Sequence, residues 1–377
     1  MSKLSNVSSY VTEKISVDSI DISEYITTDN LLQNKKGRVI AEKLPTQKVT
    51  KFKKDDILIA NIRPYLKKIW QADIEGGASS DVLVIRPNDL IDNNFLYYAL
   101  TQDSFFEYVM KGSKGTKMPR GDKSQIMNFV IPDLDIDEQI KIGKLLKCID
   151  QKIQINNQIN QELEAMAKTL YDYWFVQFDF PDQNGKPYKS SGGKMVYHPE
   201  LKREIPEGWG VVRLGELQIT TGKRDANFGT ENGKYDFWTT ANSPIKADEF
   251  SFEGKAILVA GNGNFYVNFT DGKFEAYQRT YVIQSEDEKM LIFMYMACLQ
   301  SAEKLRKASN GSIIKYITIG DVNNISSPYN HNVVNEFVKI YRPLIDQISK
   351  NKKQNQELTQ LRDWLLPMLM NGQVKVE

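Results

Sequence analysis

The stretch FKKDDILIA (Phe52–Ala60) recurs as FEGKAILVA at Phe252–Ala260. Three further pairs of stretches match in the same order along the chain: Val84–Ile85 with Val282–Ile283, FLYYA (Phe95–Ala99) with FMYMA (Phe293–Ala297), and NQEL (Asn160–Leu163) with NQEL (Asn355–Leu358). Their separation falls slowly from about 200 to about 195 residues, as a few loop deletions would produce. The ordered series therefore predicts that the chain is a duplicated unit.

Each predicted unit has a mixed first part and a helical second part. Ile57–Ala60 and Ala256–Ala260 are short apolar runs typical of buried strands. The runs 94–100 and 291–299 are longer and rich in Leu, Met and Ala, which favours helices. Long helices are predicted over about 137–178 and 333–370, because Pro132 and Pro328 stand where helix starts are expected.

We therefore expect an α+β protein in which two similar mixed α/β domains are separated by two long antiparallel α-helices, with an internal two-fold pseudo-repeat. The expected segments are a first domain over 1–133, a helix over 134–178, a polar, glycine-rich linker over 179–204, a second domain over 205–328 and a helix over 329–377.

Both predicted long helices carry a seam with alternating steps of three and four residues, the spacing of a heptad repeat. The seams consist of Ile149, Ile153, Asn156, Asn160, Leu163, Ala167, Leu170 and Trp174, and of Leu344, Ile348, Asn351, Asn355, Leu358, Arg362, Leu365 and Leu369. Asparagine occupies the same two places in both seams, where a polar side chain costs stability but specifies register. The alternative is that Ile155 and Ile159 mark the buried face and that the asparagines are solvated.

Two matched helices, each following one domain, are expected to pack antiparallel within one chain and to hold the domains apart. The alternative is an intermolecular coiled coil in a dimeric scaffold.

Charge and rare residues exclude several classes of protein. The formal net charge of +1 excludes a uniformly basic nucleic-acid binder and leaves a locally basic one open. Two cysteines and two histidines lie too far apart in the sequence to suggest a disulfide framework or a zinc site. The chain also lacks a Gly-x-x-x-x-Gly-Lys-[Ser/Thr] phosphate-binding loop. We therefore expect no catalytic residue, no metal and no cofactor in this chain.

Location is predicted from apolar segments. Met1–Tyr10 has no apolar signal core, and the longest apolar run, Met290–Leu299, is about half of what a membrane span needs. These features favour a cytoplasmic protein without a membrane partner.

Basic and amide side chains gather in a few glycine- or proline-containing stretches. A lysine or arginine falls at every third position from Lys111 to Lys123, in a loop that could follow a phosphate backbone. Turns after both predicted strands carry Asn, Arg or aromatic residues, and Asn and Arg pair with base edges. The DNA-binding candidates are Asn61, Arg63, Tyr65, Lys67, Lys114, Lys117, Arg120, Lys123, Lys223, Arg224, Asn262, Asn264, Tyr266 and Lys315. Solvated loops and ordinary turn chemistry remain the alternatives.

Three stretches resemble the specificity (S) subunit of type I restriction–modification systems. IPEGWGVVRLGEL (Ile205–Leu217) is similar to the start of a target recognition domain in that family. Ile131-Pro132, leading into Glu138-Gln139 and then IDQKI (Ile149–Ile153), and YDYWFV (Tyr171–Val176) also match it. The resemblance covers essentially the whole chain, although TEKISV (Thr12–Val17) replaces the Pro-Glu-Gly-Trp start in the first domain.

The resemblance implies two target recognition domains that read the halves of a bipartite site on double-stranded DNA. It implies that the helices space these domains and dock two methyltransferase (M) subunits, which form an adenine-N6 methyltransferase using S-adenosylmethionine. Restriction (R) subunits, with ATP and Mg, would add DNA translocation and cleavage. The alternative within DNA binding is a specificity partner of another nuclease–methylase system, of type IIG or IIB.

Overall fold

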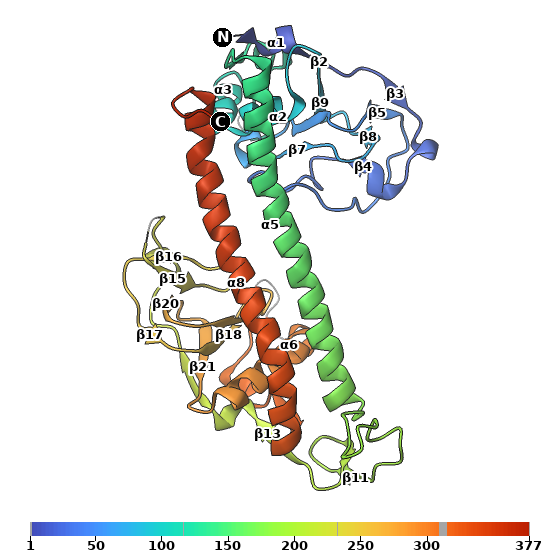
Figure 1. Ribbon diagram of the computed structural model, residues 1–377, viewed down its shortest axis with the longest axis vertical. Coiled ribbons are helices and arrows are strands. Elements are labelled where there is room, and N and C mark those ends of the chain that lie inside the picture. The colour runs from blue at the N-terminus through green and yellow to red at the C-terminus, as the bar shows by residue number, and fades with distance from the viewer. Residues whose placement is uncertain (1, 116, 232, 309–314, 377) are drawn as a thin grey trace. The chain divides into compact units, whose positions relative to one another are not determined.

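The computed structural model (Figure 1) describes residues 2–115, 117–231, 233–308 and 315–376. The chain divides into two compact units, one formed by Met1–Asn157 with Lys352–Glu377 and the other by Gln158–Asn351. The division falls within both long helices, whereas the sequence analysis placed domain boundaries at the helix ends.

Unit 1 contains two four-stranded sheets, in the orders β2-β9-β6-β7 and β3-β5-β8-β4, and a small β1-β10 pair. In the second sheet β4 runs parallel to β8, while the other pairs are antiparallel. Its elements before the first long helix are β1 (Ser2–Lys3), α1 (Leu4–Val7), β2 (Ser8–Tyr10), β3 (Lys14–Ile15), β4 (Tyr25–Ile26), β5 (Val49–Phe52), β6 (Ile57–Ala60), β7 (Ile69–Gln71), β8 (Gly76–Ala78), β9 (Val82–Pro87), α2 (Asn93–Thr101), α3 (Asp103–Lys111), α4 (Lys123–Ile126) and β10 (Val130–Ile131).

Unit 2 repeats the first sheet as β14-β21-β18-β19 and the small pair as β13-β22. Its second sheet, β16-β15-β20-β17, shares three strands with that of unit 1 but has its fourth strand at the opposite edge. Here β15 runs parallel to β20, as β4 does to β8. Its elements are β13 (Gly210–Arg213), β14 (Gln218–Thr221), β15 (Tyr235–Trp238), β16 (Ile245–Ala247), β17 (Phe252–Glu253), β18 (Ala256–Ala260), β19 (Val267–Thr270), β20 (Lys273–Ala276), β21 (Thr280–Gln284), α6 (Glu288–Ala308), α7 (Ile319–Asn323) and β22 (Ser326–Tyr329). The predicted duplication is thus present in the strand order of the first sheet and in three strands of the second, and both predicted strands and both predicted short helices form.

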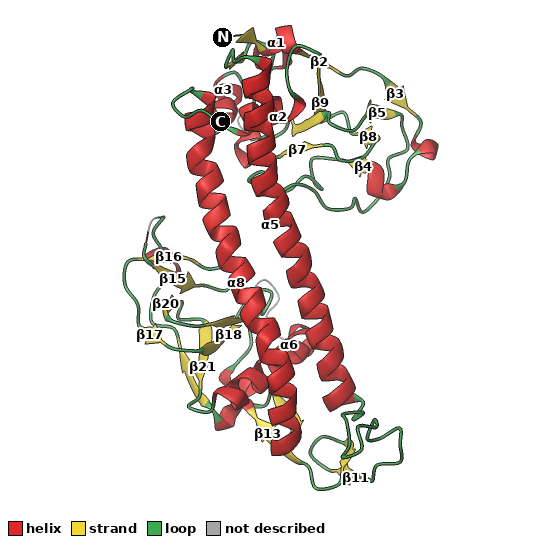
Figure 2. Cartoon of the chain, viewed as in Figure 1, coloured by secondary structure: helices red, strands yellow, loops and turns green. Residues whose placement is uncertain are grey.

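The two long helices are α5 (Ile136–Tyr171, 36 residues) and α8 (His331–Met370, 40 residues), drawn in Figure 2. α5 ends earlier than predicted and continues as a π-helical turn over Asp172–Val176. α8 contains Pro343 and Pro367, which lack the backbone N–H of other helical residues. Within each unit a part of α5 pairs with a part of α8, and the contacting residue numbers rise on one helix as they fall on the other, so the pairing is antiparallel.

Each unit buries its own apolar core against these helices. In unit 1 a cluster around Phe95, Leu96 and Phe105 also includes Leu146 from α5 and Leu369 from α8. Burying these side chains removes apolar surface from water, which is the main favourable contribution to folding. The two long helices therefore pack against the domain core as well as against each other.

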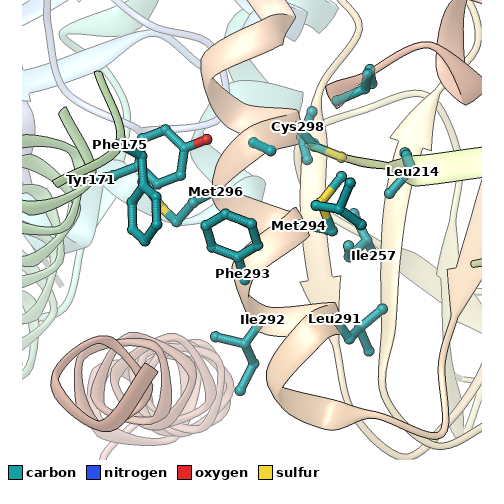
Figure 3. Packing of buried hydrophobic residues seen from close by; sticks show 14 of the residues in the cluster. Tyr171, Phe175, Leu214, Ile257, Leu291, Ile292, Phe293, Met294, Met296 and Cys298 are labelled. Carbon is teal, nitrogen blue, oxygen red and sulfur yellow. The ribbon is translucent and has the colours of Figure 1, made fainter. Parts of the chain in front are cut away.

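Figure 3 shows the corresponding core of unit 2, where α6 lies between the sheet and the long helices. Met294 and Cys298 of α6 point toward Ile257 of β18, and Phe293 points toward Phe175. The Phe293 and Phe175 ring centroids are 4.8 Å apart, which is a favourable aromatic contact.

The segment predicted as a linker is instead folded into unit 2. Residues 195–198 (β11) and 203–206 (β12) form an antiparallel hairpin. Phe180 stacks on Tyr188 with centroids 4.8 Å apart and lies 5.0 Å from Trp209. The segment predicted as a linker is therefore ordered, because Phe180 and Tyr188 within it pack on each other and Phe180 packs on Trp209.

Candidate nucleic-acid interface

The turn after β6 in unit 1 is fixed by backbone hydrogen bonds to a second loop. The Arg63 N–H donates to the Pro119 carbonyl at 2.8 Å, and the Gly121 N–H donates to the Asn61 carbonyl at 3.1 Å. Arg63 has a φ of 52°, in the left-handed region that costs non-glycine residues about 1 kcal/mol or more. The turn and the basic loop, far apart in sequence, therefore form one surface.

A third segment, which the sequence analysis missed, joins this surface. The Asn34 N–H donates to the Leu66 carbonyl and the Lys35 N–H to the Lys67 carbonyl, each at 2.9 Å. Lys36 is exposed beside them. We call Asn34–Gly37, Asn61–Lys67 and Lys114–Gly121 together the unit 1 loop surface, leaving aside Thr116, which lies outside the described residues.

Most cations of the unit 1 loop surface are held by carboxylates. Lys67 and Lys35 both contact Asp103, at 2.9 and 2.8 Å. Burial opposes ionisation of Asp103, but hydrogen bonds from the two lysines outweigh it and lower the pKa of that carboxyl. Arg120 contacts Asp81 at 3.1 Å, and Lys114 lies 3.7 Å from Asp122. These cations are thereby restricted in position.

The other predicted DNA-binding residues of unit 1 are either exposed to solvent or buried. Tyr65, Lys117 and Lys123 are exposed. Asn61 is buried, with 9% exposure, and its Oδ1 has no hydrogen-bond partner among the described residues. A Cβ on Gly121 would lie 2.9 Å from that oxygen, so Asn61 points under the loop. The structure therefore places the Asn61 side chain beneath the loop, and its role as a base reader stays a prediction.

Unit 2 repeats the bonding of the turn around different side chains. The Gly263 N–H donates to the Lys315 carbonyl at 3.0 Å, and the Ile317 N–H donates to the Gly261 carbonyl at 3.0 Å. Asn262 pairs with Tyr316 as Ile62 pairs with Arg120. Residues 309–314, which precede Lys315, lie outside the described residues.

The predicted polar residues of this second turn differ in accessibility. Asn264 is exposed and donates to the Tyr266 hydroxyl at 3.1 Å. The Asn262 Oδ1 is buried and has no hydrogen-bond partner within the described ranges. The exposed Lys315 reaches the carbonyl of Arg306 at 3.4 Å. Asn264 and Lys315 are therefore the more accessible candidates in unit 2.

Arg224 has a structural role that the sequence did not reveal. Its Nε lies 3.3 Å from an oxygen of Glu275, whose side chain is fully buried, and its Nη2 contacts Glu249 at 2.6 Å. The guanidinium also lies 4.3 Å from the Phe228 ring centroid. Because a buried carboxylate needs a partner, Arg224 serves as the ion-pair partner of Glu275, and its role as a DNA contact stays a prediction. The neighbouring Lys223 is exposed.

Three of the four seam asparagines, Asn156, Asn160 and Asn351, are buried, and Asn355 is half-buried. Asn156 and Asn160 are 1% and 6% exposed, whereas Ile155 and Ile159 are 48% and 40% exposed, so the alternative face is wrong. In unit 1 the Asn156 Nδ2 donates to the Asn355 Oδ1 at 2.8 Å. The remaining seam positions are buried or half-buried: Ile149, Ile153, Leu163, Ala167, Leu170, Trp174, Leu344, Ile348, Leu358, Arg362, Leu365 and Leu369.

The helices also expose apolar side chains. Met166 on α5 and Leu361 on α8 occupy equivalent places in the two repeats and are 57% and 44% exposed.

Among the described residues, no helix is both long and apolar enough to cross a membrane. The same residues contain no group of three or more His, Cys, Asp or Glu side chains that could hold a metal ion.

The family model described as "Type I restriction modification DNA specificity domain" matches residues 10–165 and again 206–360. The chain belongs to this family of specificity subunits. The double match agrees with the duplication seen in the sequence and in the strand order.

Curated relatives agree with this family, and a solved structure has the same fold. The specificity subunit of the type I restriction enzyme MjaIX from Methanocaldococcus jannaschii is 29% identical over 78% of this chain and 72% of its own length. That of EcoDI from Escherichia coli is 36% identical over 46% of this chain and 40% of its own length. The type I S subunit from M. genitalium has the same fold, with a TM-score of 0.63, 17% identity and coverage of 98% of this chain and 95% of that one.

Proposed function

We propose that this specificity subunit reads a bipartite double-stranded DNA site, each unit contacting one half. The observation that carries this proposal is the repeated turn, in which residues after β6 and after β18 bond to a second segment in the same way. The framework is shared while the exposed side chains differ, with Arg63, Tyr65 and Lys117 in one unit and Asn264 and Lys315 in the other. Two related frameworks with different side chains suit two different half-sites.

We propose that the helices set the gap between half-sites and dock two methyltransferase (M) subunits. α5 and α8 are each continuous helices, and a helix is a suitable spacer because its rise per residue is fixed. Met166 and Leu361 support docking, since two identical partners on a duplicated chain require equivalent exposed positions. Exposed apolar side chains are common on protein surfaces. The docking proposal therefore depends on the equivalent positions of Met166 and Leu361 in the two repeats, and not on their exposure alone.

In this proposal the chain contributes recognition and no catalysis. Adenine-N6 methylation with S-adenosylmethionine belongs to the M subunits, and ATP- and Mg-dependent translocation and cleavage belong to restriction (R) subunits. The near-neutral charge of the chain fits weak DNA binding by the isolated subunit, with further basic surface supplied by M.

Co-expression with the M subunit in a host lacking adenine methylation, followed by genome-wide mapping of N6-methyladenine, tests the proposal. The expected result is a motif of two short half-sites around a fixed gap. An assembled complex that methylates no such motif would contradict the reading role.

Charge insertion tests docking separately. Met166→Glu and Leu361→Glu should each weaken assembly with M, while the double change should abolish it. Gln158→Glu, at an exposed position of the same helix, is the matched control. Unchanged assembly in the double variant would remove the docking proposal and leave DNA reading intact.

A further inference from the structure

Arg63 and Gly263 occupy the same backbone position in the two units. Each is the third residue after the equivalent strand, β6 or β18, and each donates its N–H to the facing segment, at 2.8 and 3.0 Å. Their φ angles are 52° and 75°, both left-handed. The duplicated framework therefore requires a left-handed residue here, which glycine adopts at no steric cost.

Arginine is a poor choice for this backbone position. L-residues avoid the left-handed region, and the residue before a proline, here Pro64, is normally driven to an extended conformation. Strained residues of this kind persist where the surrounding structure holds them, and they cluster at functional sites. Unit 2 shows that glycine satisfies the same framework without strain.

No internal contact explains the arginine. Arg63 is exposed, and within the residues that the structure describes its guanidinium has no hydrogen bond or ion pair. By contrast, Arg120 and Lys67 beside it are held by Asp81 and Asp103. A Cβ on Gly263 would meet no atom of the described residues within 4 Å, so these residues leave space for a side chain at this position in unit 2.

We propose that Arg63 is a specificity-determining residue that reads a guanine in the half-site of unit 1. Its free guanidinium suits bidentate donation to guanine O6 and N7 in the major groove. The neighbouring cations restrained by carboxylates suit contacts to phosphates, which position the DNA without reading its sequence. This inference rests on the proposed function and specifies which residue reads a base and which base it reads.

The test compares methylation motifs of complexes formed with the M subunits and the wild-type chain, Arg63→Gly or Arg63→Lys. Arg63→Gly should reduce discrimination for guanine at one position of one half-site by about 10- to 100-fold, and the other half-site should not change. Arg63→Lys keeps the charge and loses the bidentate fork, so it should also relax that position. Lys202→Gly, at another exposed left-handed residue with a φ of 51°, is the matched control and should leave the motif intact.

Stability separates this role from a structural one. The Arg63→Gly chain should melt at the wild-type temperature or above, because the strain is removed. A wild-type motif that persists unchanged in Arg63→Gly would overturn the inference and leave the proposed function standing. A lowered melting temperature with equal loss at all positions of the site would also overturn it, by showing a role in folding. If the assembled wild-type complex yields no motif, the proposed function falls and this inference falls with it.

Discussion

The side-chain amide of Asn351 on α8 donates to the Oδ1 of Asn160 on α5 at 2.8 Å, inside the helix pair of unit 2. Both residues are buried, with exposures of 4% and 6%. Asn351 also accepts from Gln347 at 2.7 Å, so its amide is bonded through both ends. A buried amide without these bonds would carry an uncompensated desolvation cost, and a polar pair in a helix seam favours the register in which its bonds form.

Replacing one member of this pair should destabilise unit 2. Asn351→Ala should lower the free energy of unfolding by about 1–3 kcal/mol, because Asn160 loses its buried partner. The double change Asn160→Leu with Asn351→Leu should instead raise stability, since apolar seam residues pack without desolvation cost. Chemical denaturation measures both effects, and Gln158→Leu on the exposed side of α5 is the control. A double change that costs as much stability as Asn351→Ala, or more, would contradict this prediction.

The helix seams were predictable because a 3.5-residue period places its members on one face whatever the rest of the fold does. The repeat was predictable for a similar reason, since Ile57–Ala60 and Ala256–Ala260 are buried in equivalent strands, β6 and β18, of the corresponding sheets in the two units. The helix seams can be recognised from local periodicity, and the duplication can be recognised by comparing one half of the chain with the other.

The loop surface was only partly predictable, because backbone bonds between distant segments create it. Asn34 joins Leu66 through a main-chain bond that leaves no trace in side-chain type. Asn61 looked like a base reader, but it is covered by Gly121. Arg224 looked free because its partner Glu275 lies 51 residues away on another strand. Burial and pairing across a fold are tertiary properties, and one sequence without its fold does not show them.

An ion-pair network joins α2 to both long helices in unit 1. Arg362 contacts Asp150 at 2.7 Å, and the Tyr98 hydroxyl donates to the other oxygen of Asp150 at 2.7 Å. Burial raises the pKa of Tyr98 and the Asp150 charge raises it further, so the phenol remains a donor. Arg362→Ala should lower the free energy of unfolding by about 1–3 kcal/mol, because the half-buried Asp150 loses its counterion.

A double-mutant cycle with Asp150→Ala measures the coupling between Arg362 and Asp150. The expected cost of the double change is less than the sum of the two single costs, since the carboxylate is removed together with its partner. Strictly additive costs would show that the contact contributes no coupling energy.

The buried Tyr171 should make unit 2 sensitive to alkaline pH. Its hydroxyl lies 2.7 Å from the Ser327 hydroxyl, and burial raises the pKa of Tyr171 to about 12. The unfolded chain would lose this proton near pH 10, so the folded state binds it more tightly between about pH 10 and 12. The contribution to stability is therefore complete below pH 10 and is lost as pH rises toward 12, by about 2–3 kcal/mol.

Tyr171→Phe should flatten this alkaline part of the stability curve while costing about 1 kcal/mol at neutral pH through the lost hydrogen bond. Tyr173→Phe, at an exposed tyrosine of the adjoining π-helical turn, is the control. Urea denaturation at several pH values provides the comparison. A curve for Tyr171→Phe parallel to wild type above pH 10 would contradict the assigned effect.

Gly143 allows α5 to approach the start of α2 closely. A Cβ there would lie 2.5 Å from the Asp92 Oδ1 and 3.0 Å from the Phe95 nitrogen. The same Asp92 oxygen caps α2 by accepting from the Phe95 N–H at 2.9 Å. Gly143→Ala should therefore lower stability by about 1–3 kcal/mol although alanine favours helices by about 1 kcal/mol. Gly320→Ala in α7, where the nearest atom is 3.5 Å away, should be neutral or stabilising. A stabilised Gly143→Ala chain would show that the cap rearranges freely.

Arg224 provides a case in which lost DNA recognition should follow from lost folding. Glu275 is fully buried and is bonded by the Ser251 hydroxyl at 2.7 Å as well as by Arg224. Arg224→Ala should lower the free energy of unfolding by about 3–5 kcal/mol, because a buried charge loses its ionic partner. The double change Arg224→Ala with Glu275→Gln should recover part of that stability, since burying a neutral amide costs less desolvation free energy than burying a carboxylate. Lys223→Ala removes the adjacent exposed cation and should leave stability within about 0.5 kcal/mol of wild type. If Arg224→Ala instead kept full stability and lost only the methylation motif, Arg224 would be a DNA contact and its assignment to the core ion pair would be wrong.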